Sequence, residues 1–599
     1  MSPLQQPHPI ELPEIVLHIA QYLEVANTLA LYATSKSLRA LLAPLVWREV
    51  HFGQPVTLDL DQEPFVRRIH FKQNQQADEN YSLDVLLTNE SLIRCLSIYN
   101  YASFIPLKFA EKCTKLESLT MRGFSSCRNS KEAAEYQDCY RSLMLKQRAS
   151  LHSLTLLNWV FNPGNIPLPD DPLWNLVSSP GDVQCLRSLT LRHCRIRGRH
   201  LLSFYMICQQ LEALELVDTE IQLSELRSIA VTQGGKDIPT APQYPRLHEL
   251  TLEKMSEFRP SQQLELIICE CPRLRTLNWD VTSSFESPKR EFVSYLLSSK
   301  WPELDSITIN SLATFVTNQD LHRILQSTKQ SFRRFDVRID KIQPATVSLL
   351  RNDHFATLQT IDLTSNRDYF RGEWVIEILT SCPALQVIKA RDVTKDEIIN
   401  APPWVCLGLR HFAVYIHVGV PESGVNGRYT KEEIQQCRLI FEQLGRLKEL
   451  RVLDMLTPFI PTRSIVEKQY GNPQNELFYP TSLPLRLKAG LGLLWELTKL
   501  EKVCFWEGVH ATPKKELVWM VDHWKRLKQL MGGWRIAKGT AVSVQDKYLW
   551  AGELQEWMEQ RGISTKFCYR EEYVLRDQIK VNFEDYCGSS DDEVEGIES

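Results

Sequence analysis

A phrase of the form Leu-x-x-Leu-x-Leu, or a close apolar variant, returns along the chain from near residue 66 to residue 505. Its clearest copy is CLRSLTLRHCRI, which contains Leu186, Leu189, Leu191, Cys194 and Ile196. Self-similarity at a period of roughly 20–45 residues is typical of a stack of supersecondary units that share one elongated core. Such a stack presents a long surface in place of a pocket, so the sequence predicts a protein that binds another macromolecule.

The spacing of the copies predicts a leucine-rich-repeat solenoid, because most copies lie about 23 to 36 residues apart. In each copy the short L-x-L piece is expected to be a strand, and apolar residues at helical spacing follow, as in 201–210, 264–270 and 374–382. A strand followed by an outer helix predicts an α/β fold with a parallel concave sheet. The copies open at Val66, Ile93, Leu116, Leu151, Leu186, Leu211, Leu247, Leu274, Leu304, Phe332, Leu358, Leu385, Leu409, Leu450 and Leu500.

Composition narrows the class of partner. The chain has 599 residues with 69 basic and 73 acidic side chains, a formal charge of −4, whereas a general nucleic-acid binder usually has a basic excess. No apolar run approaches the ~18 residues needed to cross a bilayer, and the N-terminus lacks the features of a secretory signal. We therefore expect a cytoplasmic or nuclear protein with no nucleic-acid or membrane partner, whose 15 cysteines are reduced.

The repeat region is preceded by a small helical module. Pro13 suits a first helical position, and Ile15, Val16, Ile19 and Leu23 then fall on one face at helical spacing. The expected domains are this module at 10–52, the solenoid with loop insertions at 60–510, a C-terminal capping region at 511–586 and a disordered acidic tail at 587–599.

The module resembles the F-box. The family phrase is Leu-Pro, an acidic residue, a helix with Ile and a terminal Tyr-Leu, then a basic residue and a closing aromatic residue. IELPEIVLHIAQYL and TSKSLRALLAPLVWREVHF supply Leu12, Pro13, Glu14, Ile15, Ile19, Tyr22, Leu23, Lys36 and Trp47 in those places. The spacing to the first helix Ile differs by one residue, and Leu38 replaces the usual Trp of the third helix. An F-box before leucine-rich repeats resembles the F-box/leucine-rich-repeat proteins, particularly those of fungi.

This resemblance implies a non-catalytic substrate receptor. An F-box binds the Skp-type adaptor of an SCF-type cullin–RING ubiquitin ligase, and the repeats bind a protein substrate that is to be ubiquitinated. The alternative is a ubiquitin-independent scaffold whose helices cap the solenoid; a receptor should leave the apolar face of the first helix exposed, and a cap should bury it. The residues expected to bind the adaptor are Leu12, Pro13, Ile15, Val16, Ile19, Leu23, Leu29, Leu38 and Trp47.

Charged residues of the strand phrases are candidates for substrate binding, because they flank the inward apolar positions. In chain order their charge is first basic, then mostly acidic, then basic again, which favours a substrate with segments of the opposite sign. An equally open interpretation is that these charges only keep the sheet face soluble. The residues are Arg122, Arg192, Glu215, Glu253, Asp280, Asp336, Asp362, Lys389 and Arg391.

The sequence contains no recognisable catalytic motif. It has no G-x-x-x-x-G-K-[ST] loop, no H-E-x-x-H and no C-x-x-C. Cys194 and Cys271 occupy apolar repeat positions, where a core thiol is expected in preference to a zinc ligand. We therefore expect no catalytic residue, no cofactor and no metal, and an enzyme is a distant third hypothesis.

Overall fold

The chain divides into two compact units in the computed structural model. The first unit comprises Met1–Leu304, Thr308–Val316 and Ser327–Gln330, and the second comprises Asp305–Ile307, Thr317–Gln326 and Ser331–Ser599. The structure describes residues 13–23, 25–52, 69–71, 88–99, 105–123, 130–161, 185–196, 204, 206–221, 244–253, 271–281, 301–311, 318–328, 332–337, 342–364, 372–418, 430–455, 483–507, 514–534 and 556–569.

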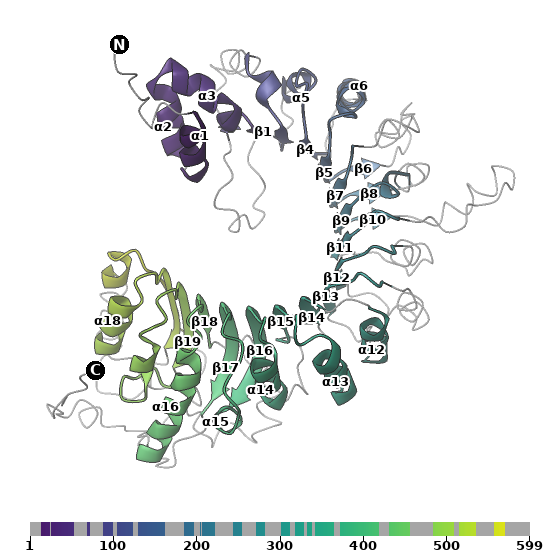
Figure 1. The fold of residues 1–599 in the computed structure, drawn as a ribbon. Helices are drawn as coiled ribbons and strands as arrows, with labels where there is room; N and C mark the ends of the chain where they lie inside the picture. The colour runs from purple at the N-terminus through teal and green to yellow at the C-terminus, as the bar shows by residue number, and fades with distance from the viewer. Residues whose placement is uncertain are drawn as a thin grey trace, which may run out of the picture. The chain divides into compact units, whose positions relative to one another are not determined.

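Three helices open the first unit: α1 (Pro13–Tyr22), α2 (Val25–Thr34) and α3 (Lys36–Val46) (Figure 1). The Ser35 side chain caps α3 by accepting a hydrogen bond from the Leu38 N–H at 3.1 Å. Val16 and Ala20 of α1 are buried with Leu42 of α3 in one apolar cluster. Helices of this length are marginal alone in water, so this cluster is what stabilises the module.

Helix α3 leads directly into a strand of the parallel sheet, β1 (Glu49–Phe52). β1 lies between β2 (Ile69–Phe71) and β3 (Cys95–Ile98), because Val50 is aligned with Ile69 on one side and with Leu96 on the other. The sequence analysis had placed 49–52 at the end of the helical module. These residues form a strand because buried Val50 alternates with polar neighbours and extends the apolar row of Leu96.

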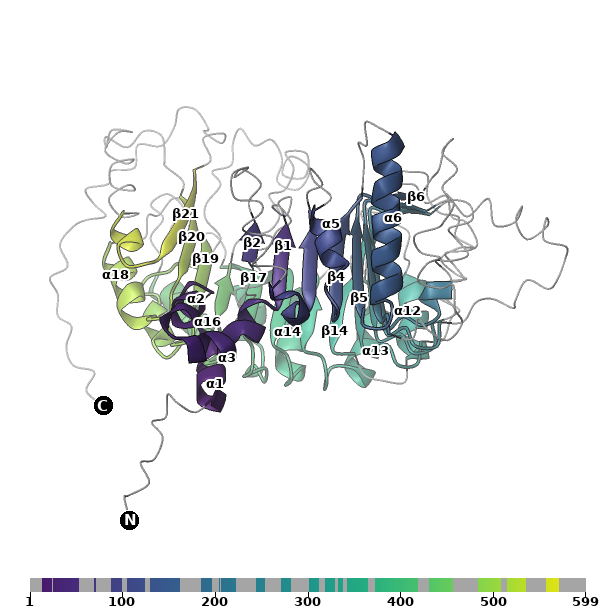
Figure 2. The same cartoon turned by 90° about the horizontal axis from the view of Figure 1, so that it is seen from above.

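From β3 onward, neighbouring strands of the first unit follow chain order and pair in parallel. Leu119, Leu154, Leu189, Leu214 and Leu250 are aligned and form one buried row. The strands are β4 (Ser118–Arg122), β5 (Ser153–Leu157), β7 (Ser188–Arg192), β9 (Ala213–Val217), β11 (Glu249–Glu253) and β12 (Thr276–Val281). The 3₁₀ turn η2 (Glu90–Leu92) precedes β3, and α5 (Ile105–Ala110) and α6 (Ser130–Gln147) lie beside β4 and β5 (Figure 1 and Figure 2).

A second, three-stranded sheet follows the ends of β5, β7 and β9. It contains β6 (Val160–Phe161), β8 (Arg195–Ile196) and β10 (Glu220–Ile221). The turn before each of these strands contains a residue with positive φ: Asn158 (57°), His193 (54°) and Asp218 (45°). Among residues other than glycine, Asn, Asp and His are enriched in this left-handed conformation. These turns therefore depend on residues that are not part of the leucine pattern.

Side chains that follow these turns bond one repeat to the previous one. The Thr219 hydroxyl lies 2.9 Å from the Leu191 carbonyl oxygen, and the Cys194 thiol lies 3.3 Å from the Leu156 carbonyl oxygen. Both side chains are buried, where an unpaired carbonyl would be costly. A polar side chain at this repeat position therefore fixes the spacing between neighbouring repeats.

The second unit continues the same construction. Its strands pair in parallel and in chain order. They are β14 (Arg334–Val337), β15 (Thr360–Asp362), β16 (Val387–Thr394), β17 (His411–His417), β18 (Val452–Asp454), β19 (Lys502–Glu507), β20 (Gln529–Trp534) and β21 (Ser564–Tyr569). Strand β13 (Ser306–Ser311) has residues in both units.

Helices alternate with these strands. Thr430 caps α16 (Lys431–Gly445) and Thr394 caps α15 (Lys395–Ile399), each in a capping box with the Glu three residues later. Gly490, at φ +111°, lets the 3₁₀ turn η3 (Leu491–Leu494) approach α16, since a Cβ there would lie 3.1 Å from Arg438 and Phe441 atoms. The helices are α12 (Asn318–Ser327), α13 (Pro344–Asp353), α14 (Gly372–Ser381), α15 (Lys395–Ile399), α16 (Lys431–Gly445) and α18 (Lys514–His523).

The structure confirms the expected α/β class with parallel strands and N-terminal helices. Each leucine phrase is followed by a strand, including those opening at Val66, Phe332, Leu409 and Leu450. Besides α18, the region 511–586 contains β20 and β21, which extend the ladder past residue 510. The tail 587–599 and segment 264–270 lie outside the described residues.

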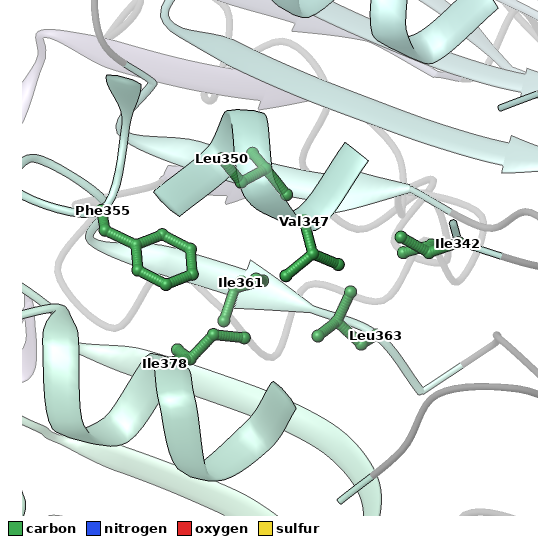
Figure 3. A pocket seen from close by; sticks show the side chains of 7 residues that line it. All are labelled: Ile342, Val347, Leu350, Phe355, Ile361, Leu363 and Ile378. Carbon is green, nitrogen blue, oxygen red and sulfur yellow. The ribbon is translucent and has the colours of Figure 1, made fainter. Parts of the chain in front are cut away.

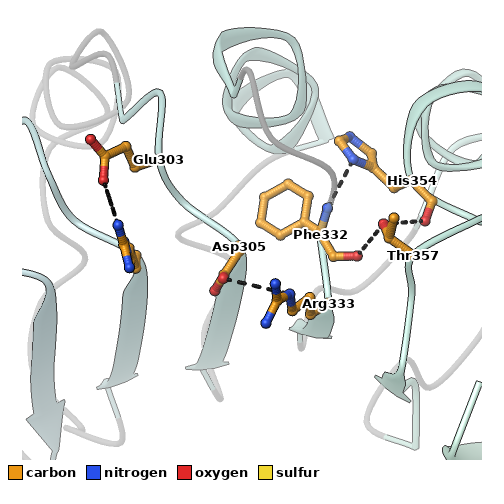
Figure 4. Close-up of polar contacts among 7 residues, drawn as sticks. Glu303, Asp305, Phe332, Arg333, His354 and Thr357 are labelled. Atoms are coloured by element: carbon orange, nitrogen blue, oxygen red, sulfur yellow. Dashed lines mark hydrogen bonds and ion pairs between the residues drawn. The ribbon is translucent and has the colours of Figure 1, made fainter. Parts of the chain in front are cut away.

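His354 is buried at the end of α13 and links two repeats of the second unit (Figure 4). Its Nδ1 accepts a hydrogen bond from the Phe332 N–H at 3.2 Å, and the two rings contact each other with centroids 4.9 Å apart. Because Nδ1 accepts, the proton of the neutral ring is on Nε2, which is buried and has no hydrogen-bond partner among the described residues. Burial lowers the pKa of His354, against a smaller opposing effect of Asp353.

We expect the free energy of unfolding of the second unit to fall as the pH is lowered from 7.5 to 5.5. The unfolded chain binds a proton near the ordinary histidine pKa of about 6.5, whereas folded His354 resists protonation, so stability is present above that pH and is lost below it. Urea unfolding across this window measures the slope. His354→Gln should make the slope shallower; an unchanged slope would contradict the assignment.

Thr219→Val should destabilise the first unit by about 1–2 kcal/mol, because it removes a buried hydroxyl and leaves the Leu191 carbonyl without that donor. Thr155→Val on the half-buried face of β5 is the matched control and should change stability by less than about 0.5 kcal/mol. Urea denaturation of the two variants checks this, and equal stabilities would refute the role of Thr219.

Candidate functional site

The first candidate site is an apolar stripe on α1. Ile15, Ile19 and Tyr22 are spaced i, i+4 and i+7, so they share one side of the helix, and their exposed fractions are 39%, 48% and 71%. Leu29 of α2 is also exposed, at 40%. We call the three residues of α1 the docking stripe. Large apolar side chains grouped on one short helix are typical of a protein-binding surface.

The opposite side of α1 is the interior of the module. Val16 and Ala20 are buried, and Leu38, Leu41 and Leu45 of α3 are half-buried against them. Helix α1 thus has two apolar faces, one used for folding and one left exposed. The docking stripe is therefore not needed to hold the module together.

The residues expected to bind the adaptor separate into these two groups. Pro13, Ile15, Ile19 and Leu29 are exposed and Leu23 is half-buried, whereas Val16, Leu38 and Trp47 face the interior of the module. Leu12 lies outside the described residues.

Trp47 and Tyr22 differ most from the sequence-based expectation. Trp47 is buried, and its indole Nε1 donates to the Tyr32 hydroxyl at 3.4 Å, while the Arg39 guanidinium lies 5.7 Å from the Tyr32 ring centroid. This tryptophan therefore links the end of α3 to α2. Tyr22 was matched to the family phrase but omitted from the adaptor-binding set, and its i+7 spacing from Ile15 is the signal that would have included it.

The second candidate site is the exposed face of the sheet in the first unit. Buried and half-buried side chains alternate along the strands, and the half-buried ones form rows across them. Two rows consist of hydroxyl side chains, which we call the hydroxyl strip: Ser118, Ser153 and Ser188 in one, and Thr120, Thr155 and Thr190 in the other. A third row contains Arg122, Leu157, Arg192, Val217, Glu253 and Asp280.

Several of the predicted substrate-binding charges in this unit are engaged with each other. Arg192 Nη2 lies 2.6 Å from Glu215 Oε1, and the Thr190 hydroxyl donates to Glu215 Oε2 at 3.2 Å. Glu253 accepts a hydrogen bond from the Asn278 amide at 3.1 Å. The sequence analysis placed Arg192 in a basic segment and Glu215 in an acidic one. In the structure the two side chains form an ion pair between neighbouring strands.

The same arrangement recurs in the second unit. Asp336, Asp362 and Lys389 are aligned on neighbouring strands, and Lys389 Nζ lies 3.3 Å from Asp362 Oδ2. Asp362 also accepts from the Thr364 hydroxyl at 2.7 Å. Arg391 lies 4.0 Å from Asp392. These pairs leave less charge for a partner than the sequence suggests.

Burial makes several groups of the sheet poor acids or bases at neutral pH. The pKa of His411 is lowered to about 4 by burial and by the nearby Lys389 and Lys502, against a smaller effect of Asp362. Burial raises the pKa of the Cys194 thiol to about 12 and that of Cys504 to about 12. A thiol with such a pKa is protonated at pH 7 and is a weak nucleophile.

A small cavity in the second unit is lined only by apolar side chains (Figure 3). It measures about 10 Å³, close to the lower limit for one water molecule, and offers that water no polar partner. The cavity is therefore a packing gap. Its lining residues are Ile342, Val347, Leu350, Phe355, Ile361, Leu363 and Ile378.

Two further properties hold within the described ranges. No group of three or more His, Cys, Asp or Glu side chains is placed to hold a metal ion. In the same part of the chain, no helix combines the length and the apolar character that a bilayer crossing requires.

Comparison with known proteins identifies no relative: no protein-family model and no curated protein matches the sequence. The interpretation of function therefore depends on the solenoid fold and on where its side chains lie. A repeat-like parallel-sheet fold of this kind is that of a protein-binding scaffold.

The Arg192–Glu215 pair should stabilise the contact between β7 and β9. A double-mutant cycle with Arg192→Ala and Glu215→Ala is expected to give a coupling energy of about 0.5–1 kcal/mol, because the pair is close but partly exposed. The control cycle, Arg187→Ala with Glu212→Ala, joins a 3.8 Å pair between neighbouring repeats and should give a coupling near zero. Urea denaturation of each set measures both couplings, and equal values would contradict the prediction.

Proposed function

We propose that this protein is the non-catalytic substrate-recognition subunit of an SCF-type ubiquitin ligase. In this function the N-terminal module binds a Skp-type adaptor, and through it a cullin–RING ligase, while the repeats bind a protein substrate. The observation that carries the proposal is the docking stripe, because Ile15, Ile19 and Tyr22 are exposed on a helix whose other face is already packed.

The stripe favours adaptor binding over the capping alternative. Helices that only cap a solenoid would bury their apolar face against the first repeat. Here α3 leads directly into β1, and the Ile15, Ile19 and Tyr22 face of α1 is left exposed. An amphipathic helix with i, i+4 and i+7 apolar residues is also a common means of docking onto a partner.

The proposal assigns no chemistry to this chain. The Cys194 and Cys504 thiols are poor nucleophiles at neutral pH, and the apolar cavity is too small for a substrate. The chain would act by holding a substrate near the ubiquitin-carrying subunits, which raises its effective concentration there. Ubiquitin ligases of this kind act in the cytoplasm and nucleus, which is where we place the protein.

The test is co-purification of the chain with the Skp-type adaptor and cullin of its host. Ile15→Asp combined with Ile19→Asp should abolish capture, because two carboxylates would be desolvated in the contact. The matched control is Leu407→Asp, the same type of change at a residue that is 50% exposed in the second unit, and it should leave capture intact.

Circular dichroism and thermal unfolding should show that both variants remain folded, since neither altered face belongs to a core. Failure of the folded unaltered chain to capture the adaptor would sink the ligase proposal and leave the ubiquitin-independent scaffold. Equal capture by the stripe variant and the control would show that another surface binds.

A further inference from the structure

The hydroxyl strip lies beside the row that begins with Arg122 and continues to Glu253 on the exposed face of the first unit. Its six short side chains come from β4, β5 and β7, and each hydroxyl can both donate and accept a hydrogen bond. Short uncharged side chains let another backbone approach the sheet closely. The strip is therefore suited to an extended peptide more than to a bulky or highly charged surface.

Arg122 is the available cation beside the strip. It is half-buried at the end of β4, and among the described residues it makes no hydrogen bond or ion pair. Arg192, two strands further along the same row, is already bound to Glu215. A guanidinium without a counter-ion favours a carboxylate or a phosphate, which it can bind through two parallel hydrogen bonds.

Carboxylates mark the other end of the same row. Glu253 of β11 is aligned with Asp280 of β12. The Glu253 carboxylate accepts a hydrogen bond from the neutral amide of Asn278 at 3.1 Å and forms no ion pair with another described residue. A basic side chain of a partner would pair with the Glu253 carboxylate.

The register fixes the distance between the two ends. Arg122 is followed in its row by Leu157, Arg192, Val217 and Glu253, which makes four steps between strands. At about 4.8 Å per step the separation is roughly 19 Å. An extended chain covers that distance in about six residues.

We propose that this face binds an extended segment of the substrate with an acidic or phosphorylated side chain over Arg122 and a basic side chain over Glu253, about five or six residues away. The inference rests on the proposed function, in which the repeats bind the substrate. The bound segment thus carries two opposite charges, and its direction on the sheet is set by which end lies over Arg122.

The experiment is selection of a displayed library of random peptides, each of about twelve residues, on the full chain. The same selection is run on the charge-reversed variant Arg122→Glu with Glu253→Lys. The unaltered chain should enrich peptides with an acidic and a basic residue at the stated spacing. The reversed variant should lose those peptides at least tenfold and should enrich peptides of the opposite polarity.

A synthetic peptide of the enriched sequence, with phosphoserine in place of the acidic residue, distinguishes the two sources of the anion by fluorescence anisotropy. If the phosphopeptide binds more tightly than the selected peptide, Arg122 recognises a phosphorylated side chain of the substrate. If it binds more weakly, Arg122 recognises an Asp or Glu side chain. Glu253→Gln, which keeps an acceptor for Asn278, should weaken either peptide.

Enrichment without the charge spacing, or peptides that bind both chains equally, would overturn the inference, as would no enrichment at all. Adaptor capture by the same preparations separates this failure from failure of the proposed function. A charge-reversed chain that still captures the adaptor has an intact N-terminal module, so its loss of peptides reports on the strand face alone.

Discussion

The main-chain hydrogen bonds that join the start of each strand to its neighbour are the interaction on which the rest of the structure depends. The Arg187 carbonyl accepts from the N–H groups of both Glu212 and Ala213, at 2.7 and 3.0 Å. In the second unit the Gln386 carbonyl accepts in the same way from Arg410 and His411, at 2.8 and 3.0 Å. Once this register is fixed, the aligned leucines of the phrases face the core and the alternate positions face outward.

Most of the fold could be predicted because the spacing of the leucines and the register of the strands both follow from burying one apolar row in the core. Leu189 and Leu214 are aligned on neighbouring strands, and both face the core, which is why both positions are apolar in the sequence. Among the strands that escaped prediction, β1 contains a single buried valine, and in β20 the apolar pair Leu530 and Met531 is followed by two glycines. Their assignment needs the neighbouring strand, which single-sequence periodicity does not supply.

The candidate sites were less predictable, since they depend on contacts between distant residues. The sequence places Ile15, Val16 and Ile19 together on a helix, but only the packing of Val16 against Leu42 tells which of them remain exposed. Charges behave similarly. Arg192 and Glu215 are separated by 23 residues, and their signs give no indication that they bind each other until β7 and β9 are aligned.

The two surfaces of the first unit differ in the physics of what they can bind. The docking stripe is apolar, so an association there would draw on burial of apolar area, at about 25 cal/mol per Å², and would change little with salt. The strand face is polar, its opposite charges are partly paired, and an association there would weaken as ionic strength rises.

A constant partner suits the first surface, because apolar burial gives affinity with little dependence on sequence. Exchangeable partners suit the second, because spaced charges and hydroxyl groups discriminate among segments while contributing modest affinity. A receptor that must keep one partner and release another requires this division, and the placement of Ile19 and Arg122 on different elements of one unit provides it.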